Sequence, residues 1–223
     1  MNEKSLTTAT SKGQGTLSAA ARQLIFTDLD GTLLDHYSYS ANPAKPTLAA
    51  LESRNIPVIF CSSKTYAEIL PLRAELANQH PFVVENGAAI FIPQHYFMPH
   101  STLKPPKPNP IQSQTIGEYT CHSFCQPRSH WQGQLNKLPT TYQQQFRSFQ
   151  QMGNDIIAQQ TGLSLAQAQL ANQRFFSEPL EWCEGAITEQ LFYTAMRKLG
   201  ARTTKGGRFN HVSGAVSKGL AIQ

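Results

Sequence analysis

The segment Gln23-Leu-Ile-Phe-Thr-Asp-Leu-Asp-Gly-Thr32 joins a short apolar run to an acidic turn. Its first part is rich in residues that favour strands, which predicts a buried strand ending in a sharp turn. Residues two positions apart in an extended segment point in the same direction, so Asp28 and Asp30 are expected to face one crevice. Gly31 allows the tight turn because it has no side chain to clash.

Two carboxylates placed in this way can divide the work of phosphoryl transfer. One can attack phosphorus as a nucleophile, and the other can protonate the leaving oxygen and then activate water. Because two close anions repel each other and a phosphate, the site requires a divalent cation, and Mg2+ suits oxygen ligands. The structural alternative is an ordinary surface Asp-Gly turn after a strand.

Outward from this segment, short apolar runs alternate with stretches of helical periodicity. The expected strands are 23–27, 58–61 and 82–84, and the expected helices are 46–54 and 65–76. Thr65 and Glu68 have the spacing of a capping box at the start of the second helix. The order strand, helix, strand, helix, strand with short loops predicts an α/β fold with a Rossmann-like, doubly wound parallel sheet.

Polar residues follow each of these three strands. Ser62 and Lys64 come after the second strand, and Glu85 and Asn86 come after the third. Ligands of a doubly wound sheet bind outside the carboxyl ends of its strands. We therefore expect these residues to lie beside the two aspartates at one edge of the sheet.

The chain beyond the third strand is expected to contain an inserted cap. Five prolines between residues 99 and 114 indicate an extended connection. Further helices are expected within 139–161 and at 165–172 and 188–199, and further strands at 174–180 and 209–212. The expected organisation is a disordered leader at 1–22, a first core part at 23–92, an α+β cap at 93–207 and the start of a second core part at 208–223.

Residues 26–35, Phe-Thr-Asp-Leu-Asp-Gly-Thr-Leu-Leu-Asp, resemble the first motif of the haloacid dehalogenase-like hydrolase superfamily. In that superfamily the first aspartate is the nucleophile and the second is the acid and base, and the resemblance assigns these catalytic roles to Asp28 and Asp30. We interpret Asp35 as a solvated loop carboxylate.

Two further catalytic residues rest on the same resemblance. Ser62 resembles the second-motif hydroxyl, which holds an oxygen of the phosphoryl group, and the neighbouring Ser63 stays an alternative. Lys218, within Val216-Ser-Lys-Gly-Leu220, resembles the third-motif lysine, whose charge offsets the aspartates and the phosphate.

Four other segments resemble the mannosyl-3-phosphoglycerate phosphatase family. They are Cys61-Ser-Ser-Lys-Thr65, Val84-Glu-Asn-Gly-Ala88, Arg174-Phe-Phe-Ser-Glu-Pro179 and Gly207-Arg-Phe-Asn-His-Val212. The resemblance runs from about residue 24 to the end of the chain. It implies Mg2+-dependent hydrolysis of mannosyl-3-phosphoglycerate, or of its glucosyl counterpart, to the glycosylglycerate and phosphate through an aspartyl phosphate.

The same resemblance implies a set of ligand-binding residues. Mg2+ would be held at Asp28 and Asp30, and the substrate would be bound by Lys64, Asn86, Arg174, Glu178, Arg208 and His211. The substrate carries a carboxylate as well as a phosphate, and arginine suits bidentate contact with a carboxylate. Each of the cap residues can alternatively have a purely structural role.

Charge and composition favour a small anionic substrate over a macromolecular partner. The formal net charge is +5, and six Lys or Arg but no acidic residues lie between Gln190 and Gln223. No Lys/Arg run with interleaved aromatic residues is present, so we expect no nucleic-acid partner. No apolar run approaches the roughly 18 residues of a membrane span, so we expect no membrane partner. The sequence does not indicate the oligomeric state.

The four cysteines show no CxxC spacing and are expected to be reduced thiols, as is typical of a cytoplasmic protein. A metal site at Cys121, His122 and Cys125 is the alternative.

The superfamily closes its site with a fourth, acidic motif after the lysine helix. This sequence ends at Gln223, five residues past Lys218, and has no acidic residue after Glu189. We therefore expect the chain as given to be an inactive fragment of a phosphatase. Two alternatives are a catalytically silent remnant that binds a ligand or partner, and a sugar phosphatase with a different substrate.

Overall fold

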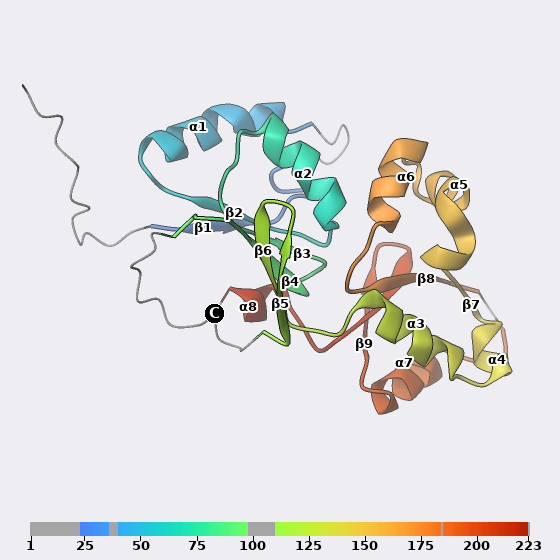
Figure 1. Ribbon diagram of the computed structural model, residues 1–223. Coiled ribbons are helices and arrows are strands. Elements are labelled where there is room, and N and C mark those ends of the chain that lie inside the picture. The colour runs from blue at the N-terminus through green and yellow to red at the C-terminus, as the bar shows by residue number, and fades with distance from the viewer. Residues whose placement is uncertain (1–22, 36–39, 98–109, 184, 223) are drawn as a thin grey trace, which may run out of the picture.

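The computed structural model describes residues 23–35, 40–97, 110–183 and 185–222 of the 223-residue chain. The strands in these ranges form two sheets, one of six strands and one of four (Figure 1). The expected leader at 1–22 lies outside the described residues. Among the helices of the described ranges, none has the length and apolarity that crossing a bilayer requires.

The six-stranded sheet has the order β1-β2-β3-β4-β6-β5. Its strands are β1 (Ile25–Thr27), β2 (Val58–Cys61), β3 (Phe82–Val84), β4 (Ala89–Pro93), β5 (Gln112–Ile116) and β6 (Tyr119–Ser123). The first three run parallel, as the sequence predicts, with Phe26 opposite Ile59 and Phe60 opposite Phe82. Parallel pairing brings the carboxyl ends of β1, β2 and β3 to the same edge of the sheet.

Helices cover both faces of this sheet. Figure 1 shows α1 (Lys45–Ser53) and α2 (Tyr66–Glu75) over one face and α8 (Lys218–Ala221) under the other, and a short 3-10 turn, η1 (Asn42–Ala44), precedes α1. Alternate residues of β2 serve the two faces: Phe60 belongs to the same core cluster as Ile69, whereas Ile59 and Cys61 pack with Ala221. The Rossmann-like α/β core is therefore confirmed.

The second helix begins where its capping box predicts. The Glu68 amide donates to the Thr65 hydroxyl at 3.0 Å, and the Thr65 amide donates to the Glu68 carboxylate at 2.8 Å. These bonds satisfy amide groups that have no partner inside the helix. The Thr65 hydroxyl also donates to the Leu170 carbonyl at 2.9 Å, so the start of α2 is tied to a distant part of the chain.

The second half of the six-stranded sheet differs from the expected organisation. β3, β4, β6 and β5 pair antiparallel, so the sheet is mixed. The hairpin of β5 and β6 lies inside the range expected to be cap, yet Phe91 of β4 stands opposite Cys121 of β6. The physical reason is that β4 would otherwise be an exposed edge, and non-local pairing with β6 covers it.

The four-stranded sheet has the order β7-β8-β10-β9 and is antiparallel. Its strands are β7 (Phe146–Ser148), β8 (Glu178–Trp182), β9 (Arg202–Gly206) and β10 (Phe209–Ser213). The helices around it are α3 (Arg128–Asn136), α4 (Thr140–Gln143), α5 (Phe149–Thr161), α6 (Leu165–Asn172) and α7 (Glu189–Lys198). We call residues 128–213 the cap.

Three sequence-based boundaries in the cap are corrected. β10 was expected to open the second core part at 208, but a two-residue loop, Gly207-Arg208, makes it the hairpin partner of β9. The helical pattern of 139–161 is interrupted by β7, which pairs with β8. The strand expected at 174–180 begins only at Glu178.

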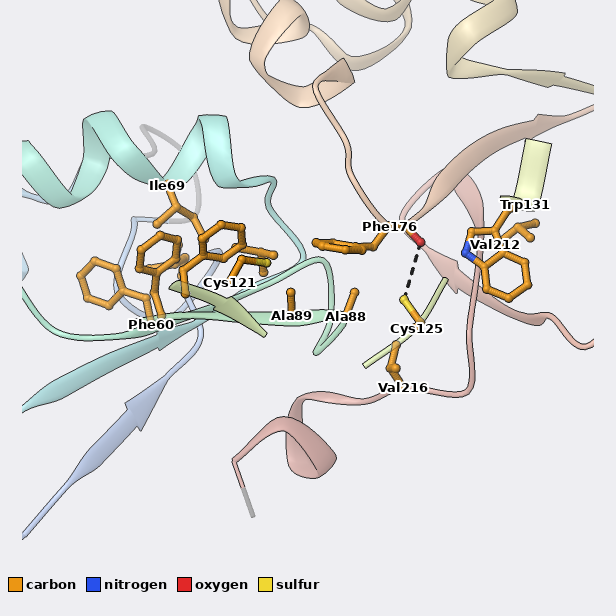
Figure 2. Close-up of a cluster of buried hydrophobic side chains, with 14 of the residues drawn as sticks. Phe60, Ile69, Ala88, Ala89, Cys121, Cys125, Trp131, Phe176, Val212 and Val216 are labelled. Carbon is orange, nitrogen blue, oxygen red and sulfur yellow. Dashed lines mark hydrogen bonds between the residues drawn. The ribbon is translucent and has the colours of Figure 1, made fainter. Parts of the chain in front are cut away.

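One apolar cluster runs from the sheet core into the cap. Figure 2 shows Phe176 between the core residues Ala88 and Ala89 and the cap residues Trp131 and Val212. All five are nearly inaccessible to solvent. Because burying apolar surface is the main favourable term in folding, this shared cluster holds the cap against the sheet.

Candidate active site

The turn after β1 presents the Asp28 carboxylate at the edge of the sheet. One oxygen, Oδ1, accepts from the Leu29 amide at 2.7 Å, and the other, Oδ2, accepts from the Lys218 ammonium at 2.6 Å. The Leu29 carbonyl accepts from the amides of Leu33 and Leu34, which closes the turn, and Gly31 has a φ of 68°. About two fifths of the Asp28 side chain is exposed, at 44%, so an incoming group can reach it.

The second carboxylate has a lysine of its own. Lys64 Nζ lies 2.9 Å from Asp30 Oδ1 and 4.0 Å from Glu68 Oε1. The structure therefore pairs Asp28 with Lys218 and Asp30 with Lys64. The strand-end rule predicts the second pair, whereas Lys218 was expected from the resemblance.

Ser62 lies at the end of β2 and is fully buried. Its hydroxyl accepts from the Lys64 amide at 3.1 Å. Its own amide donates to the Val83 carbonyl at 3.1 Å, so the end of β2 remains paired with β3. A hydroxyl held at this point can bond a phosphate oxygen without adding charge.

Lys218 reaches Asp28 because the chain comes very close to the turn after β3. A Cβ atom added at Gly87 would lie 2.1 Å from the Ser217 carbonyl oxygen and 2.8 Å from the Lys218 amide nitrogen. Gly87 also has a φ of 95°, which side chains disfavour. The Ser217 hydroxyl caps α8 by accepting from the Leu220 amide at 3.1 Å, which fixes the start of the lysine helix.

Comparison with known proteins identifies the family of this chain. Residues 25–172 match the family described as haloacid dehalogenase-like hydrolase. A glucosyl-3-phosphoglycerate/mannosyl-3-phosphoglycerate phosphatase of Methanococcoides burtonii is 35% identical over 202 residues, covering 91% of this chain and 71% of the relative. The chain is a haloacid dehalogenase-like hydrolase of the phosphatase type. Its expected resemblance to mannosyl-3-phosphoglycerate phosphatases is confirmed.

A second relative agrees with this assignment, and two solved structures share the fold. A protein of the same name from Persephonella marina is 33% identical and covers 90% of this chain and 70% of its own length. Among solved structures, Thermoplasma acidophilum 0175 superposes with a TM-score of 0.59 at 14% identity, covering 91% of this hydrolase and 69% of that chain. The HAD subclass IIB sugar phosphatase BT4131 gives 0.56 at 13% identity, covering 91% and 74%. These two structures share the fold.

The expected substrate residues Asn86 and Arg174 lie beside the loop of Ser62 and Lys64. Asn86 donates its amide to the Ser62 carbonyl at 2.9 Å. Arg174 is largely buried, with Nη2 donating to the Ser63 carbonyl at 3.0 Å and Nε to the Ser177 hydroxyl at 2.9 Å. Nε and Nη2 of Arg174 therefore already bond protein groups, whereas a bidentate contact with a substrate carboxylate would use two such nitrogens.

Glu178 lies in the interior of the cap, where both oxygens have partners. Arg128 Nε donates to Oε2 at 2.5 Å and Arg128 Nη2 to Oε1 at 3.0 Å. The Gln132 side chain and the Gln150 amide donate to the same carboxylate at 2.8 and 3.2 Å. This fully bonded carboxylate joins α3, α5 and β8, and no pattern in the sequence pointed to its partner Arg128.

The other two expected substrate residues sit on the β9–β10 hairpin. Arg208 is exposed and donates from Nη1 to the Gln160 carbonyl at 2.8 Å, at the end of α5. His211 has a buried Nδ1 without a hydrogen-bond partner among the described residues. Burial lowers the pKa of His211 to about 3, and the nearby positive charge of Arg174 adds to the effect, so the ring is neutral at physiological pH.

Three of the four cysteines have the character of buried apolar residues, and Cys183 is partly exposed. Cys61, Cys121 and Cys125 are buried free thiols. Burial raises the pKa of Cys61 to about 11 and the pKa values of Cys121 and Cys125 to about 12, so they are protonated thiols at neutral pH. His122 Nδ1 instead lies 2.8 Å from the Ser113 hydroxyl. In the described ranges, no group of three or more His, Cys, Asp or Glu is placed to hold a metal ion.

We predict that Gly87→Ala displaces Lys218 and helix α8 from Asp28. The added methyl group collides with Ser217, so the variant should lose about 1–3 kcal/mol of unfolding free energy beyond the cost of its positive φ. Gly200→Ala is the matched control, because Gly200 has a φ of 82° and open space around its Cβ position. Urea unfolding measures both, and amide spectra should shift at Lys218 in Gly87→Ala alone. Equal losses of stability in the two variants would contradict the predicted contact.

Proposed function

We propose that this hydrolase removes phosphate from mannosyl-3-phosphoglycerate or glucosyl-3-phosphoglycerate, with Asp28 as the nucleophile and Asp30 as the acid and base. The observation that carries the proposal is the pair of carboxylates at the end of β1, each 2.6–2.9 Å from a lysine and close to the buried hydroxyl of Ser62. The names of the two relatives supply the substrate.

The proposed reaction has two steps, which use these groups in turn. An oxygen of Asp28 attacks phosphorus, the bond from phosphorus to the glycerate oxygen breaks, and Asp30 gives that oxygen its proton. Asp30 then takes a proton from water, which attacks the aspartyl phosphate and frees Asp28 and inorganic phosphate. Lys218 and Lys64 offset the negative charge, and the Ser62 hydroxyl bonds a phosphoryl oxygen.

The oxygen donors fit Mg2+ as the cofactor. Asp28 and Asp30 supply hard oxygen ligands, and Mg2+ is commonly held by one or two carboxylates together with phosphate oxygens and waters. When bound, the ion supplies positive charge that relieves repulsion between the carboxylates and the phosphate. We place the reaction in the cytoplasm, where free thiols such as those of Cys61, Cys121 and Cys125 are usual.

We expect Asp28→Asn to lower turnover by several orders of magnitude while the fold is kept, because the amide cannot form the covalent bond to phosphorus. The measurement is steady-state phosphate release from glucosyl-3-phosphoglycerate with millimolar Mg2+. Asp155→Asn is the control, since it makes the same change at an exposed position of α5. Retention of more than about a tenth of the original turnover in Asp28→Asn would refute the assignment of the nucleophile.

Substrate choice is tested by comparing compounds with and without the glycerate carboxylate. We expect hydrolysis of the two glycosyl-3-phosphoglycerates to exceed that of sugar monophosphates. Arg208→Ala should raise KM for the former more than for p-nitrophenyl phosphate, because a guanidinium suits a carboxylate. Arg202→Ala, also an exposed arginine of the cap hairpin, is the control. Equal effects of Arg208→Ala on both kinds of substrate would remove the case for carboxylate recognition.

We expect the 223-residue chain to bind Mg2+ weakly and to hydrolyse the substrate at a measurable rate that stays below about one per second. Asp28 and Asp30 each have a lysine ammonium on one carboxylate oxygen, so the ion competes with a positive charge that is already present. Calorimetric titration with Mg2+ measures this directly. Lys64→Gln should bind Mg2+ more tightly than the unchanged chain because it removes one competitor. Turnover of about one per second or faster would show this expectation to be wrong.

A further inference from the structure

Each of the three consecutive carbonyl groups of the catalytic loop, residues 62–64, accepts a hydrogen bond. The Ser62 carbonyl accepts from the Asn86 amide at 2.9 Å, and the Lys64 carbonyl accepts from the Glu85 amide at 3.0 Å. The carbonyl between them, that of Ser63, accepts from Nη2 of Arg174 at 3.0 Å. Two of the three donors belong to the turn after β3, and the third comes from the cap.

Glu85 connects these donors to the cap through its side chain. One carboxylate oxygen accepts from the Phe175 amide at 2.8 Å, and the other accepts from the Phe176 amide at 3.2 Å and the Ser177 hydroxyl at 2.6 Å. Arg174 Nε lies 3.5 Å from the second oxygen. The Glu85 side chain has no solvent exposure and that of Arg174 only 5%. A buried carboxylate is tolerated only where it is paired and hydrogen-bonded, and here both conditions hold.

The backbone at this turn is also held in an uncommon conformation. Glu85 has a φ of 48° and Asn86 a φ of 60°, and Gly87 follows at 95°. Asparagine tolerates the left-handed region, whereas glutamate has no special aptitude for it. Such a conformation persists where the surroundings over-determine it. The contacts of Glu85 with residues 174–177 supply that constraint.

We infer that Glu85 and Arg174 are positioning residues that fasten the base of the cap, residues 174–177, to the catalytic loop. The guanidinium is the junction, since it bonds the loop through one nitrogen and faces Ser177 and Glu85 through another. Lys64 extends the connection to Asp30. The position of the cap thereby sets the direction of the Ser62 hydroxyl and the Lys64 ammonium. For its effect on catalysis this inference rests on the proposed function.

This role differs from binding the substrate carboxylate with Arg174. A substrate ligand would have a guanidinium open to the site, whereas Arg174 is buried and two of its nitrogens have protein partners. Lysine would keep the positive charge beside Glu85 but lacks the planar fork by which Arg174 bonds Ser63 through one nitrogen and Ser177 through another. Arg174→Lys therefore removes the two-point hydrogen bonding of the guanidinium and keeps the positive charge beside Glu85.

The test is amide hydrogen exchange on the 223-residue chain, which needs no catalytic activity. In Arg174→Lys we expect exchange at least tenfold faster at Phe175 and Phe176 and also at Glu85 and Asn86, relative to Phe91 in β4 as the internal reference. Ser177→Ala, a milder change, should give a smaller effect at the same four amides. Exchange at Glu85 and Asn86 that stays unchanged in both variants overturns the inference.

Glu178→Gln is the matched control, because Glu178 is an equally buried carboxylate with an arginine partner inside the cap. It should speed exchange at Gln150, which donates to it, and leave Glu85 and Asn86 unchanged. Acceleration of Glu85 and Asn86 in this variant as well would mean that any loss of cap stability loosens the loop, and the specific junction would be refuted.

Kinetics then separate positioning from substrate binding. Arg174→Lys should lower kcat for p-nitrophenyl phosphate and for glucosyl-3-phosphoglycerate by a similar factor, since both depend on the same loop. A rise in KM confined to the carboxylate-bearing substrate would overturn positioning in favour of direct binding. If the unchanged chain hydrolyses neither compound, the proposed function fails, while the exchange experiment still decides whether the junction exists.

Discussion

Charge neutralisation at the carboxyl ends of the parallel strands is the constraint on which the site depends. Asp28, Asp30 and Glu85 lie there, and each has a cation within 3.5 Å. Close carboxylates without such partners would repel one another and the substrate phosphate. The three cations come from three segments, namely the loop after β2, the base of the cap and the start of α8. The fold of the whole chain is therefore needed to supply them.

The sequence predicts the local part of this arrangement well. Period, caps and turn residues located β1, β2, β3, α1 and α2 to within about two residues, and the comparisons confirm the family. These elements follow from contacts between near neighbours, such as the capping box of Thr65 and Glu68. The strand-end rule for parallel sheets also placed Ser62 and Lys64 beside the aspartates, since it depends on the order of elements alone.

The remaining features depend on pairing between distant segments, which periodicity does not encode. The β5–β6 hairpin joins the core sheet because β4 has a free edge, and β10 stays in the cap because a two-residue loop returns it to β9. In the same way, the resemblance singled out Glu178 and Arg174 as substrate-binding residues with a structural role as the alternative, but it did not indicate the partners of either side chain. Tertiary packing determines these partners. Glu178 joins β8 to α3 through Arg128, and Arg174 joins the cap to the loop after β2 through Ser63. The position of Glu85 at a strand end predicted that it lies near the site, but it did not predict the contacts of Glu85 with residues 175–177 of the cap.

The ion pairs at the site also differ in how much chain each must close. Asp30 and Lys64 belong to neighbouring strands of one βαβ unit, whereas Lys218 is 190 positions from Asp28 and follows the entire cap. Closing a longer loop costs more conformational entropy, and non-local contacts form only after that cost is met. Asp30 and Lys64 can thus be organised by the first half of the chain, whereas the pair of Asp28 and Lys218 requires a folded cap. Gly87 contributes to both stages. It lies in the turn after β3, which belongs to the first half of the chain, and its lack of a side chain leaves room for Ser217 just before α8.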